Sequence, residues 1–229
     1  IDTWPLSPKE IGDPPMGITA ENVAERWKIS REEQDEFSYY SQMKAARALR
    51  EGRFKEQIVP VVIPQKKGEP IIFDTDEHPR PNTTLEALSK LPPVFKPGGT
   101  VTAGSSSGIN DGAAALVLCS GDRAQELDLK PMARVVAFAS AGVDPNIMGI
   151  GPVPATRKVM AKAGLTVADM DVIELNEAFA AQSIACCREL GSDWRDRDYE
   201  KLNPNGGAIA LGHPIAGSLA ILTVKAVYE

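Results

Sequence analysis

The second half of the sequence alternates short apolar runs with helical patterns, and this alternation limits the chain to few architectures. Apolar runs at 133–139 and 172–175 predict strands. The patterns at 154–163 and 177–190 predict helices, because a glycine follows each of them. The run at 113–119 suits either a buried strand or the start of a buried helix. Strands and helices that alternate in this way favour an α/β layered fold.

The first half is predicted to be helical and then irregular. Residues 19–51 predict two helices, with N-caps at Thr19 and Ser30. Glu33, three residues after Ser30, completes a capping box. Downstream, the pattern predicts a strand, a polar proline-rich loop and one short helix within that loop, at residues 58–63, 66–97 and 84–91.

Charge and cysteine content exclude several classes of protein. The 229 residues carry 25 Lys and Arg against 31 Asp and Glu, and this net charge of −6 disfavours nucleic-acid binding. We interpret the adjacent Cys186 and Cys187 as buried, reduced thiols, so we expect the cytoplasm, with the mitochondrial matrix and the peroxisome left open. Because neither the cysteines nor the two histidines have ligand spacing, no metal site is expected.

Residues 206–224 lack charged side chains over nearly the length of a membrane-spanning helix. Gly212, Pro214 and Gly217 interrupt the stretch, so we expect no membrane span. The part after Gly217 predicts a helix that is buried on all sides.

A junction between a predicted strand and a predicted helix makes Asn176 a candidate functional residue. Its amide follows the carboxyl end of the strand, where open α/β sheets place ligand sites. In the alternative, Asn176 is an ordinary N-cap and Glu177 is an acid in the first helical turn. Spacing alone favours this second, structural interpretation.

His213 is the second candidate, because it lies in a loop of glycines and is followed by Pro214. The glycines allow a ligand to approach the backbone, and Pro214 fixes the chain after the imidazole. A histidine in such a loop suits a general base. A hydrogen-bonded core histidine is an equally good interpretation of the local chemistry.

Several motifs in a fixed order together resemble the thiolase family of CoA-dependent acyltransferases. They cover nearly the whole chain from Met16 and read MGITAEN (16–22), SREEQD (30–35), TAGSSSGINDGAAA (102–115), MGIGPVPA (148–155), NEAF (176–179), NGG (205–207) and GHP (212–214). Independent motifs in the family's order are more specific than any one of them. The resemblance therefore outweighs the structural interpretations of Asn176 and His213.

The resemblance implies a thiolase reaction. In this family a Cys thiolate attacks a 3-ketoacyl-CoA, acetyl-CoA leaves, and a second CoA takes the acyl group; the reverse direction is a Claisen condensation. By resemblance, His213 would activate the nucleophile and help to form an oxyanion pocket. Asn176 would hold a water that serves the enolate oxygen.

The same resemblance implies contacts to CoA, which is a substrate and not a permanently bound cofactor. Ser107 would meet the pantetheine arm, and Arg80 would lie near the adenine end. Met16, Met148 and Phe179 would line the acyl-pantetheine pocket. An arginine for a nucleotide and apolar walls for a thioester are chemically reasonable.

The fold implied is a thiolase-like α/β layered fold, present in part, with a helical loop domain over the CoA site. We expect the loop domain at 1–110, the last strand of the N-terminal half at 111–120 and most of the C-terminal half at 121–229. That strand would lack its sheet. We therefore expect the chain alone to be poorly stable or to need a partner that bears the rest of the fold.

The sequence departs from the family at three points. The family's nucleophilic Cys belongs to a region expected before Ile1, and its second catalytic Cys to a motif expected beyond Glu229. None of the three cysteines here matches either motif, so we expect an interior segment that is inactive on its own. After His213-Pro214 the family's small residues are reordered as IAGSLAI (215–221). The family's usual histidine before the first Met-Gly pair is Pro15.

Two alternatives to a thiolase remain. One is a non-catalytic thiolase-like protein that binds CoA esters or supports a partner subunit. The other is a ketoacyl-carrier-protein synthase, which shares the fold, although the segment 176–179 favours a thiolase. A complete protein is expected to bind acyl-CoA and CoA and to form a homo-oligomer, either a dimer or a tetramer.

Overall fold

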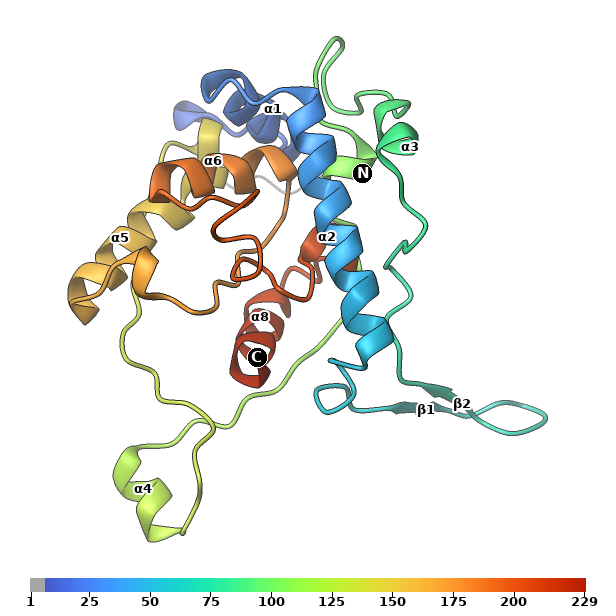
Figure 1. The fold of residues 1–229 in the computed structure, drawn as a ribbon, viewed down its shortest axis with the longest axis vertical. Coiled ribbons are helices and arrows are strands. Elements are labelled where there is room, and N and C mark those ends of the chain that lie inside the picture. Colours follow the sequence, from blue (N-terminus) through green and yellow to red (C-terminus); the bar gives the residue numbers. More distant parts are fainter. Residues whose placement is uncertain (1–6) are drawn as a thin grey trace.

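Helices dominate the structure, a computed structural model that describes residues 7–229 (Figure 1). The α-helices are α1 (Met16–Arg26), α2 (Arg31–Glu51), α3 (Leu85–Ser89), α4 (Gly121–Glu126), α5 (Pro152–Ala163), α6 (Ala180–Leu190), α7 (Ala208–Leu211) and α8 (Ser218–Tyr228). The strands are β1 (Val61–Ile63) and β2 (Ile71–Phe73), and the 3-10 helices are η1 (Lys9–Ile11), η2 (Ala103–Ser105), η3 (Pro145–Ile150) and η4 (Val167–Asp169). Among the described residues, β1 and β2 form the one sheet, and they are antiparallel.

Helix α6 lies at the centre of the helical body. Ala180, Ala181, Ile184 and Ala185 are 0% exposed, and α6 packs against α1, α2, α5 and η3. Its alanines have no side chain beyond Cβ, so the surrounding helices can approach it closely. The position of α6 therefore fixes where the segment just before it, which holds Asn176, enters the fold.

The hydrophobic core fills the space between α1, α2 and α6. Phe37 of α2 meets Trp194 edge-on, with ring centroids 5.1 Å apart. The buried members of the core are Val23, Ile29, Phe37, Ile150, Val153, Ala180, Ile184, Ala185, Cys186, Cys187, Trp194, Leu202 and Ile209. Because burial of apolar surface is the main favourable contribution to folding, this core holds the loop around Leu202 and the short α7 against α2.

The ends of α2 follow the sequence. The Ser30 hydroxyl accepts a hydrogen bond from the Glu33 backbone N–H at 3.2 Å, which confirms Ser30 as the N-cap. Gly52 ends the helix in the left-handed region, with a φ of 71°. The expected N-cap at Thr19 is wrong, because Thr19 lies inside α1, which begins at Met16.

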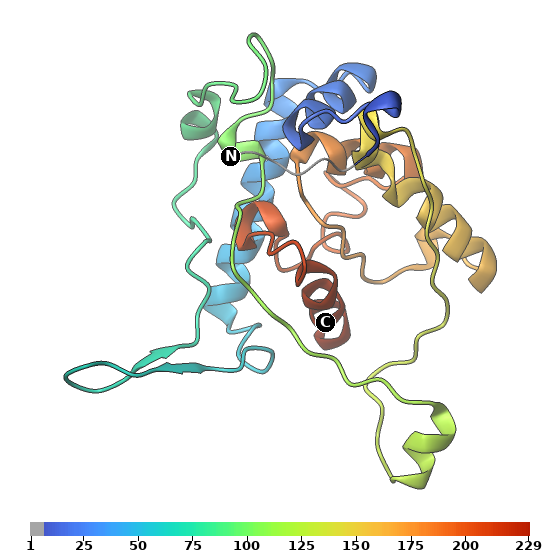
Figure 2. The same ribbon diagram turned by 180° about the vertical axis from the view of Figure 1, so that it is seen from behind.

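The hairpin β1–β2 projects from the helical body beyond the end of α2 (Figures 1 and 2). Val61 pairs with Phe73, and Ile63 pairs with Ile71. The predicted strand at 58–63 is thus confirmed in its second half. All six strand residues are exposed, so the hairpin contributes little to the core.

Residues 113–119 and 133–139 run as irregular chain and carry α4 away from the helical body (Figures 1 and 2). The expected strand at 133–139, and either element expected at 113–119, is absent from the structure. Val117 is 97% exposed and Phe138 is 83% exposed. A strand requires a neighbouring strand for its backbone hydrogen bonds, and the described part of the chain places none beside these segments.

The region around Asn176 also differs from the prediction. Residues 172–175 form a single parallel bridge, between Ile173 and Leu202, in place of a strand. Helix α6 begins at Ala180, three residues later than predicted, because the chain before it is held in an extended form by other contacts described below.

Helix α8 begins at Ser218, directly after Gly217, as predicted. The expectation that it is buried on all sides is wrong, because Leu219 is 78% exposed. No helix in the described chain combines the length and the apolar character needed to cross a membrane.

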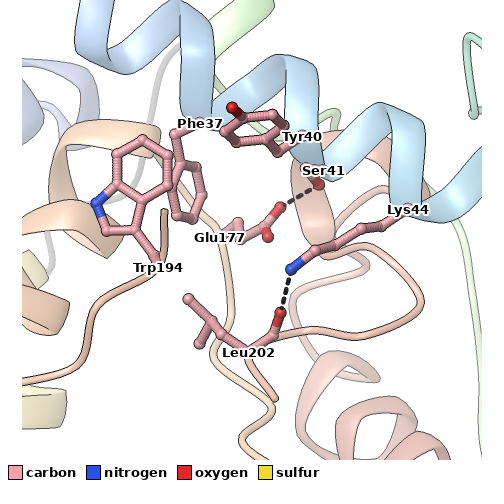
Figure 3. A pocket seen from close by; sticks show the side chains of 7 residues that line it. All are labelled: Phe37, Tyr40, Ser41, Lys44, Glu177, Trp194 and Leu202. Carbon is pink, nitrogen blue, oxygen red and sulfur yellow. Dashed lines mark hydrogen bonds between the residues drawn. The ribbon is translucent and has the colours of Figure 1, made fainter. Parts of the chain in front are cut away.

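Two lysine side chains, Lys44 and Lys225, are buried in the described part of the chain. Lys44 of α2 is 6% exposed and donates hydrogen bonds to the carbonyls of Tyr199 and Leu202, the latter at 2.7 Å (Figure 3). Its ammonium group also lies 4.1 Å from the centroid of the Tyr199 ring. Burial lowers the pKa of Lys44 to about 8, because the charged form loses its hydration.

Replacement of Lys44 by Met should remove a pH dependence from stability. Between pH 8 and 10.5 the unfolded lysine keeps its proton and the folded lysine does not, so the free energy of unfolding of the native chain rises with pH. The free energy of unfolding of the native chain should therefore rise relative to that of Lys44→Met by about 3 kcal/mol over this range, at 1.36 kcal/mol per pKa unit. Urea unfolding followed by circular dichroism at several pH values measures it.

Lys90→Met, which removes the exposed ammonium group of an ion pair with Glu86, is the control. The lowered pKa would be contradicted if the difference in free energy of unfolding between the native chain and Lys44→Met stayed constant from pH 7 to 10.5.

Candidate functional site

The ring of His213 is held from two sides in the loop between α7 and α8. Its Nδ1 lies 2.6 Å from the Ser218 hydroxyl, and its Nε2 lies 3.4 Å from the side-chain nitrogen of Asn176. The backbone N–H of His213 donates to the carbonyl of Gly108 at 3.2 Å. Three segments that are far apart in the sequence therefore meet at His213.

The hydrogen bonds assign the proton on the neutral imidazole. The amide nitrogen of Asn176 can only donate, so Nε2 of His213 accepts and carries the lone pair. The ring proton is then on Nδ1 and is donated to Ser218, whose own hydroxyl donates to the carbonyl of Pro214 at 3.0 Å. The Nε2 lone pair of the ring thus faces Asn176 and accepts its hydrogen bond.

Burial also favours the neutral ring. His213 is partly buried, and desolvation of the charged form lowers its pKa below the usual value for histidine. At pH 7 the ring is therefore mainly unprotonated, the state that a general base requires.

Asn176 is fixed by contacts of its two neighbours. The side chain of Asn203 accepts from the Leu175 N–H at 2.8 Å and donates to the Leu175 carbonyl at 2.9 Å. Glu177 is buried, at 2% exposure. The structural interpretation of this pair is wrong, because the N-cap of α6 is Phe179 and Glu177 lies outside the first helical turn.

Ser107 and Phe179 lie on neighbouring strand-like segments next to Asn176. The Ser107 N–H donates to the carbonyl of Ala178 at 3.0 Å, and Ser106 forms an antiparallel bridge with Phe179. The Phe179 ring meets Phe95 edge-on, with centroids 5.8 Å apart. The structure therefore brings Ser107 and Phe179 together with the Asn176–His213 pair.

Met16, Met148 and Arg80 are further from this pair. Met16 begins α1, and its neighbour Gly17 packs tightly against the Phe95 ring that also contacts Phe179. Met148 lies in η3, beside α1 and α6, and is 41% exposed. Within residues 7–229, no hydrogen bond joins Met148 or Arg80 directly to Asn176 or His213.

The Arg80 segment is nevertheless attached to α7. The Arg80 N–H donates to the side-chain oxygen of Gln42 at 2.8 Å, and the amide of Gln42 donates to the Ile209 carbonyl at 3.2 Å. His78, two residues earlier, donates from Nδ1 to the Ala210 carbonyl at 2.8 Å. The Arg80 side chain itself is exposed and free to meet a ligand from solvent.

Close packing behind His213 explains one of its glycines. Gly212 has a φ of 90°, and a Cβ there would overlap the buried side-chain oxygen of Asn110. Gly108, whose carbonyl binds His213, is packed equally tightly against His78 and Asn110. At Gly212 the positive φ and the close approach of Asn110 together favour glycine.

The two buried cysteines are not activated. Burial raises the pKa of Cys186 to about 11 and that of Cys187 to about 12, so both remain thiols at neutral pH. Cys119 is exposed at the end of the extended segment before α4. The part of the chain that the structure describes holds no group of three His, Cys, Asp or Glu side chains placed to bind a metal ion.

Sequence reasoning missed three groups at this site: the Ser218 hydroxyl, the Gly108 carbonyl and the Asn203 side chain. Ser218 offered a signal, because a hydroxyl five residues after a candidate base can reach its ring across one turn. Gly108 lies in the motif at 102–115, but nothing in that motif marks its carbonyl as a partner of His213. Asn203 offered no signal, since it meets the site only through tertiary folding.

Comparisons with known proteins show what the whole chain is similar to. The family model described as "Thiolase, N-terminal domain" matches residues 9–122, and "Thiolase, C-terminal domain" matches residues 129–229. The chain is 60% identical to an acetyl-CoA acetyltransferase of Syntrophomonas wolfei over 93% of this chain and 53% of that protein. It is 54% identical to a beta-ketoadipyl-CoA thiolase of Pseudomonas aeruginosa over 98% of this chain and 55% of that one. The chain thus spans about half the length of the curated relatives it matches.

Two solved structures share the fold. The Bacillus anthracis acetyl-CoA acetyltransferase superposes with a TM-score of 0.90 at 47% identity, over 95% of this chain and 54% of that one. The human mitochondrial 3-ketoacyl-CoA thiolase superposes with a TM-score of 0.89, also at 47% identity, over 97% and 54%. The expected thiolase-like α/β fold, present in part, is therefore confirmed.

Replacement of Ser218 by Ala should move the proton on His213. The Nδ1–H would lose its acceptor, and an unpaired buried donor costs about 1–3 kcal/mol. We therefore expect the Nε2–H tautomer to gain population at the expense of the Nδ1–H tautomer, with the Asn176 amide turned so that its oxygen accepts from Nε2–H. The ¹⁵N chemical shifts of the two ring nitrogens at pH 8 measure this.

His78 supplies an internal control, because its Nδ1 partner is the backbone of Ala210 and is untouched by the substitution. Ser218→Thr keeps a hydroxyl and should keep the native tautomer. An unchanged tautomer in Ser218→Ala would contradict the assignment.

Proposed function

Because the chain belongs to the thiolase family, we propose that it carries the base and the amide of a CoA-dependent acyl transfer. The reaction is the thiolytic cleavage of a 3-ketoacyl-CoA to acetyl-CoA and acyl-CoA, or the reverse Claisen condensation. The observation that supports this best is the neutral His213 with its Nε2 lone pair toward Asn176, 3.4 Å away.

His213 would take the proton of a thiol at Nε2. The ring would then be positively charged, and Ser218 would continue to accept from its Nδ1–H. Asn176 has an amide that can donate a hydrogen bond, directly or through a water, to the oxygen that becomes negative in an enolate. A base and a neutral donor side by side suit a reaction that moves a proton while negative charge develops on a thioester oxygen.

The CoA contacts form part of the proposal. Ser107 lies on the segment that pairs with Phe179 and suits the pantetheine arm. The exposed Arg80 suits the nucleotide end, since its guanidinium can bind phosphates. Phe179, Met16 and Met148 would form the apolar wall, joined in part by Phe95.

We further propose that this chain by itself binds CoA esters without turning them over. Thiolysis needs a thiolate as nucleophile, and the pKa values of Cys186 and Cys187 are raised far above neutrality by burial. Cys119 is exposed, at the end of the irregular segment that leads from the helical body to α4 (Figure 1). We also propose, from the family resemblance alone, that the complete protein assembles as a homo-oligomer. Its proposed location in the cytoplasm is supported by the bacterial relatives.

Arg80→Ala should weaken CoA binding. Loss of one arginine–phosphate contact is expected to reduce the affinity about tenfold, which corresponds to about 1.4 kcal/mol. Isothermal titration calorimetry of CoA and of acetoacetyl-CoA with the 229-residue chain measures the change.

Arg123→Ala is the matched control, because Arg123 is an exposed arginine of α4 outside the site. Equal losses of affinity in the two variants would indicate a general charge effect and contradict the role of Arg80.

The chain is expected to show no thiolysis of acetoacetyl-CoA in the presence of CoA, because Cys186 and Cys187 are buried thiols with raised pKa values and Cys119 lies on the segment that leads away to α4 (Figure 1). The decrease in acetoacetyl-CoA absorbance, compared with buffer alone, measures the rate. Turnover that is lost in His213→Ala would show that a cysteine of this chain does act as nucleophile, and would overturn the proposed inactivity.

A further inference from the structure

We propose that Glu177 is a positioning residue that sets the geometry between Asn176 and His213. Its buried carboxylate ties the backbone next to Asn176 to α7, the helix that ends two residues before His213. The importance of this geometry for catalysis rests on the proposed function. The structural role of Glu177 does not depend on that function.

The carboxylate of Glu177 accepts hydrogen bonds from three separate segments. Its Oε2 accepts from the Ser41 hydroxyl at 2.6 Å (Figure 3). The same oxygen accepts from the Ile209 N–H at 3.3 Å, and Oε1 accepts from the Asn203 amide at 2.7 Å. Ser41 belongs to α2, Asn203 to the loop before α7, and Ile209 to α7 itself. One side chain therefore hydrogen-bonds to all three elements at once, in addition to the pairwise bonds from Gln42 to Ile209 and from Lys44 to Leu202.

The contact with α7 is close as well as polar. A Cβ at Gly207, the residue before α7, would overlap the Glu177 carboxylate. The Gly207 N–H also donates to the Ser41 hydroxyl at 3.1 Å, which in turn donates to Glu177. The start of α7 is thus fixed on the carboxylate directly and through Ser41.

Asn176 is fixed from both sides by this network. Asn203 binds both backbone polar groups of Leu175, on one side of Asn176, and binds the Glu177 carboxylate on the other. Asn203 itself adopts a positive φ of 44°, and its side chain contacts both residues. The Asn176 side chain is left free to point toward His213.

The Asn176–His213 contact is sensitive to any shift of α7. At 3.4 Å it is already longer than the usual 2.9–3.0 Å of an N–H hydrogen bond. His213 follows Ile209 by four residues, so a displacement of α7 is passed on to the ring. Burial raises the pKa of Glu177, and the hydrogen bonds from Ser41 and Asn203 oppose this effect by stabilising the carboxylate.

Glu177→Gln tests the proposal in the 229-residue chain without substrate. A glutamine has the same shape but presents an amide NH₂ to one of three donors, so at least one contact is lost. We expect the side-chain amide signals of Asn176 and the Nε2 signal of His213 to shift together in ¹⁵N correlation spectra. The His78 signals, which report a separate hydrogen bond to Ala210, should move less than those of His213.

Glu33→Gln is the matched control. Glu33, which belongs to α2, is also a buried carboxylate. It accepts hydrogen bonds from the Arg188 guanidinium at 2.6 and 2.7 Å and makes none with Asn176 or His213 within the described chain. We expect it to lower stability while the Asn176 and His213 signals stay in place. Equal shifts in both variants, or no shift in Glu177→Gln, would overturn the proposal.

Ser41→Ala covers the case in which Glu177→Gln does not fold. It removes one donor to the carboxylate and should shift the same Asn176 and His213 signals by a smaller amount. Unchanged signals in Ser41→Ala, with Glu177→Gln unfolded, would count against the proposal. Failure of the chain to bind CoA would refute the proposed function but would leave these spectra, and the role of Glu177, unaffected.

Discussion

A carboxylate that is removed from water must be surrounded by donors, and this requirement at Glu177 organises the middle of the molecule. Glu177 is 2% exposed, and its donors come from α2, from the loop before α7 and from α7 itself. Nearby, the buried ammonium group of Lys225 in α8 binds Glu174 at 2.8 Å and the carbonyl of Gly206 at 2.6 Å. Buried charges therefore connect the chain on both sides of Asn176 to the two helices that flank His213. Apolar packing around α6 supplies the rigid background, and these polar contacts select one arrangement within it.

The sequence predicted the two groups at the centre of the site but not what holds them. Asn176 and His213 lie in short motifs whose order in the chain resembles a known family, so they were found without a structure. Ser41, Asn203 and Gly108 act through contacts across more than twenty residues of chain, and no local pattern marks them. Glu177 was visible, but helix position alone predicted an ordinary acid in the first helical turn. The start of α6 at Ala180, and the burial of Glu177, depend on tertiary contacts that outweigh local preference.

The fold was predicted best where the controlling interactions are local. Ser30 and Gly52 bound α2, and Gly164 and Gly191 end α5 and α6 in the left-handed region, as their positions in the sequence indicate. Strands are different, because their hydrogen bonds come from another segment. The apolar runs at 113–119 and 133–139 have the composition of buried strands, yet within residues 7–229 they lie in no sheet. Composition thus identified the preference of these segments for strand structure. Whether a strand forms depends on a neighbouring strand that supplies its backbone hydrogen bonds.

The irregular run at 113–119 also affects how this chain behaves in solution. Its seven residues include no charge, proline or glycine, and Val117 and Leu118 are 97% and 73% exposed. An uncovered apolar segment with free backbone groups is a template on which a second molecule can pair edge to edge. The net charge of −6 opposes such pairing only weakly, since salt screens charges over about 10 Å at 0.1 M. Protein concentration and salt, more than the strength of the core, will therefore determine how long the isolated chain stays dispersed.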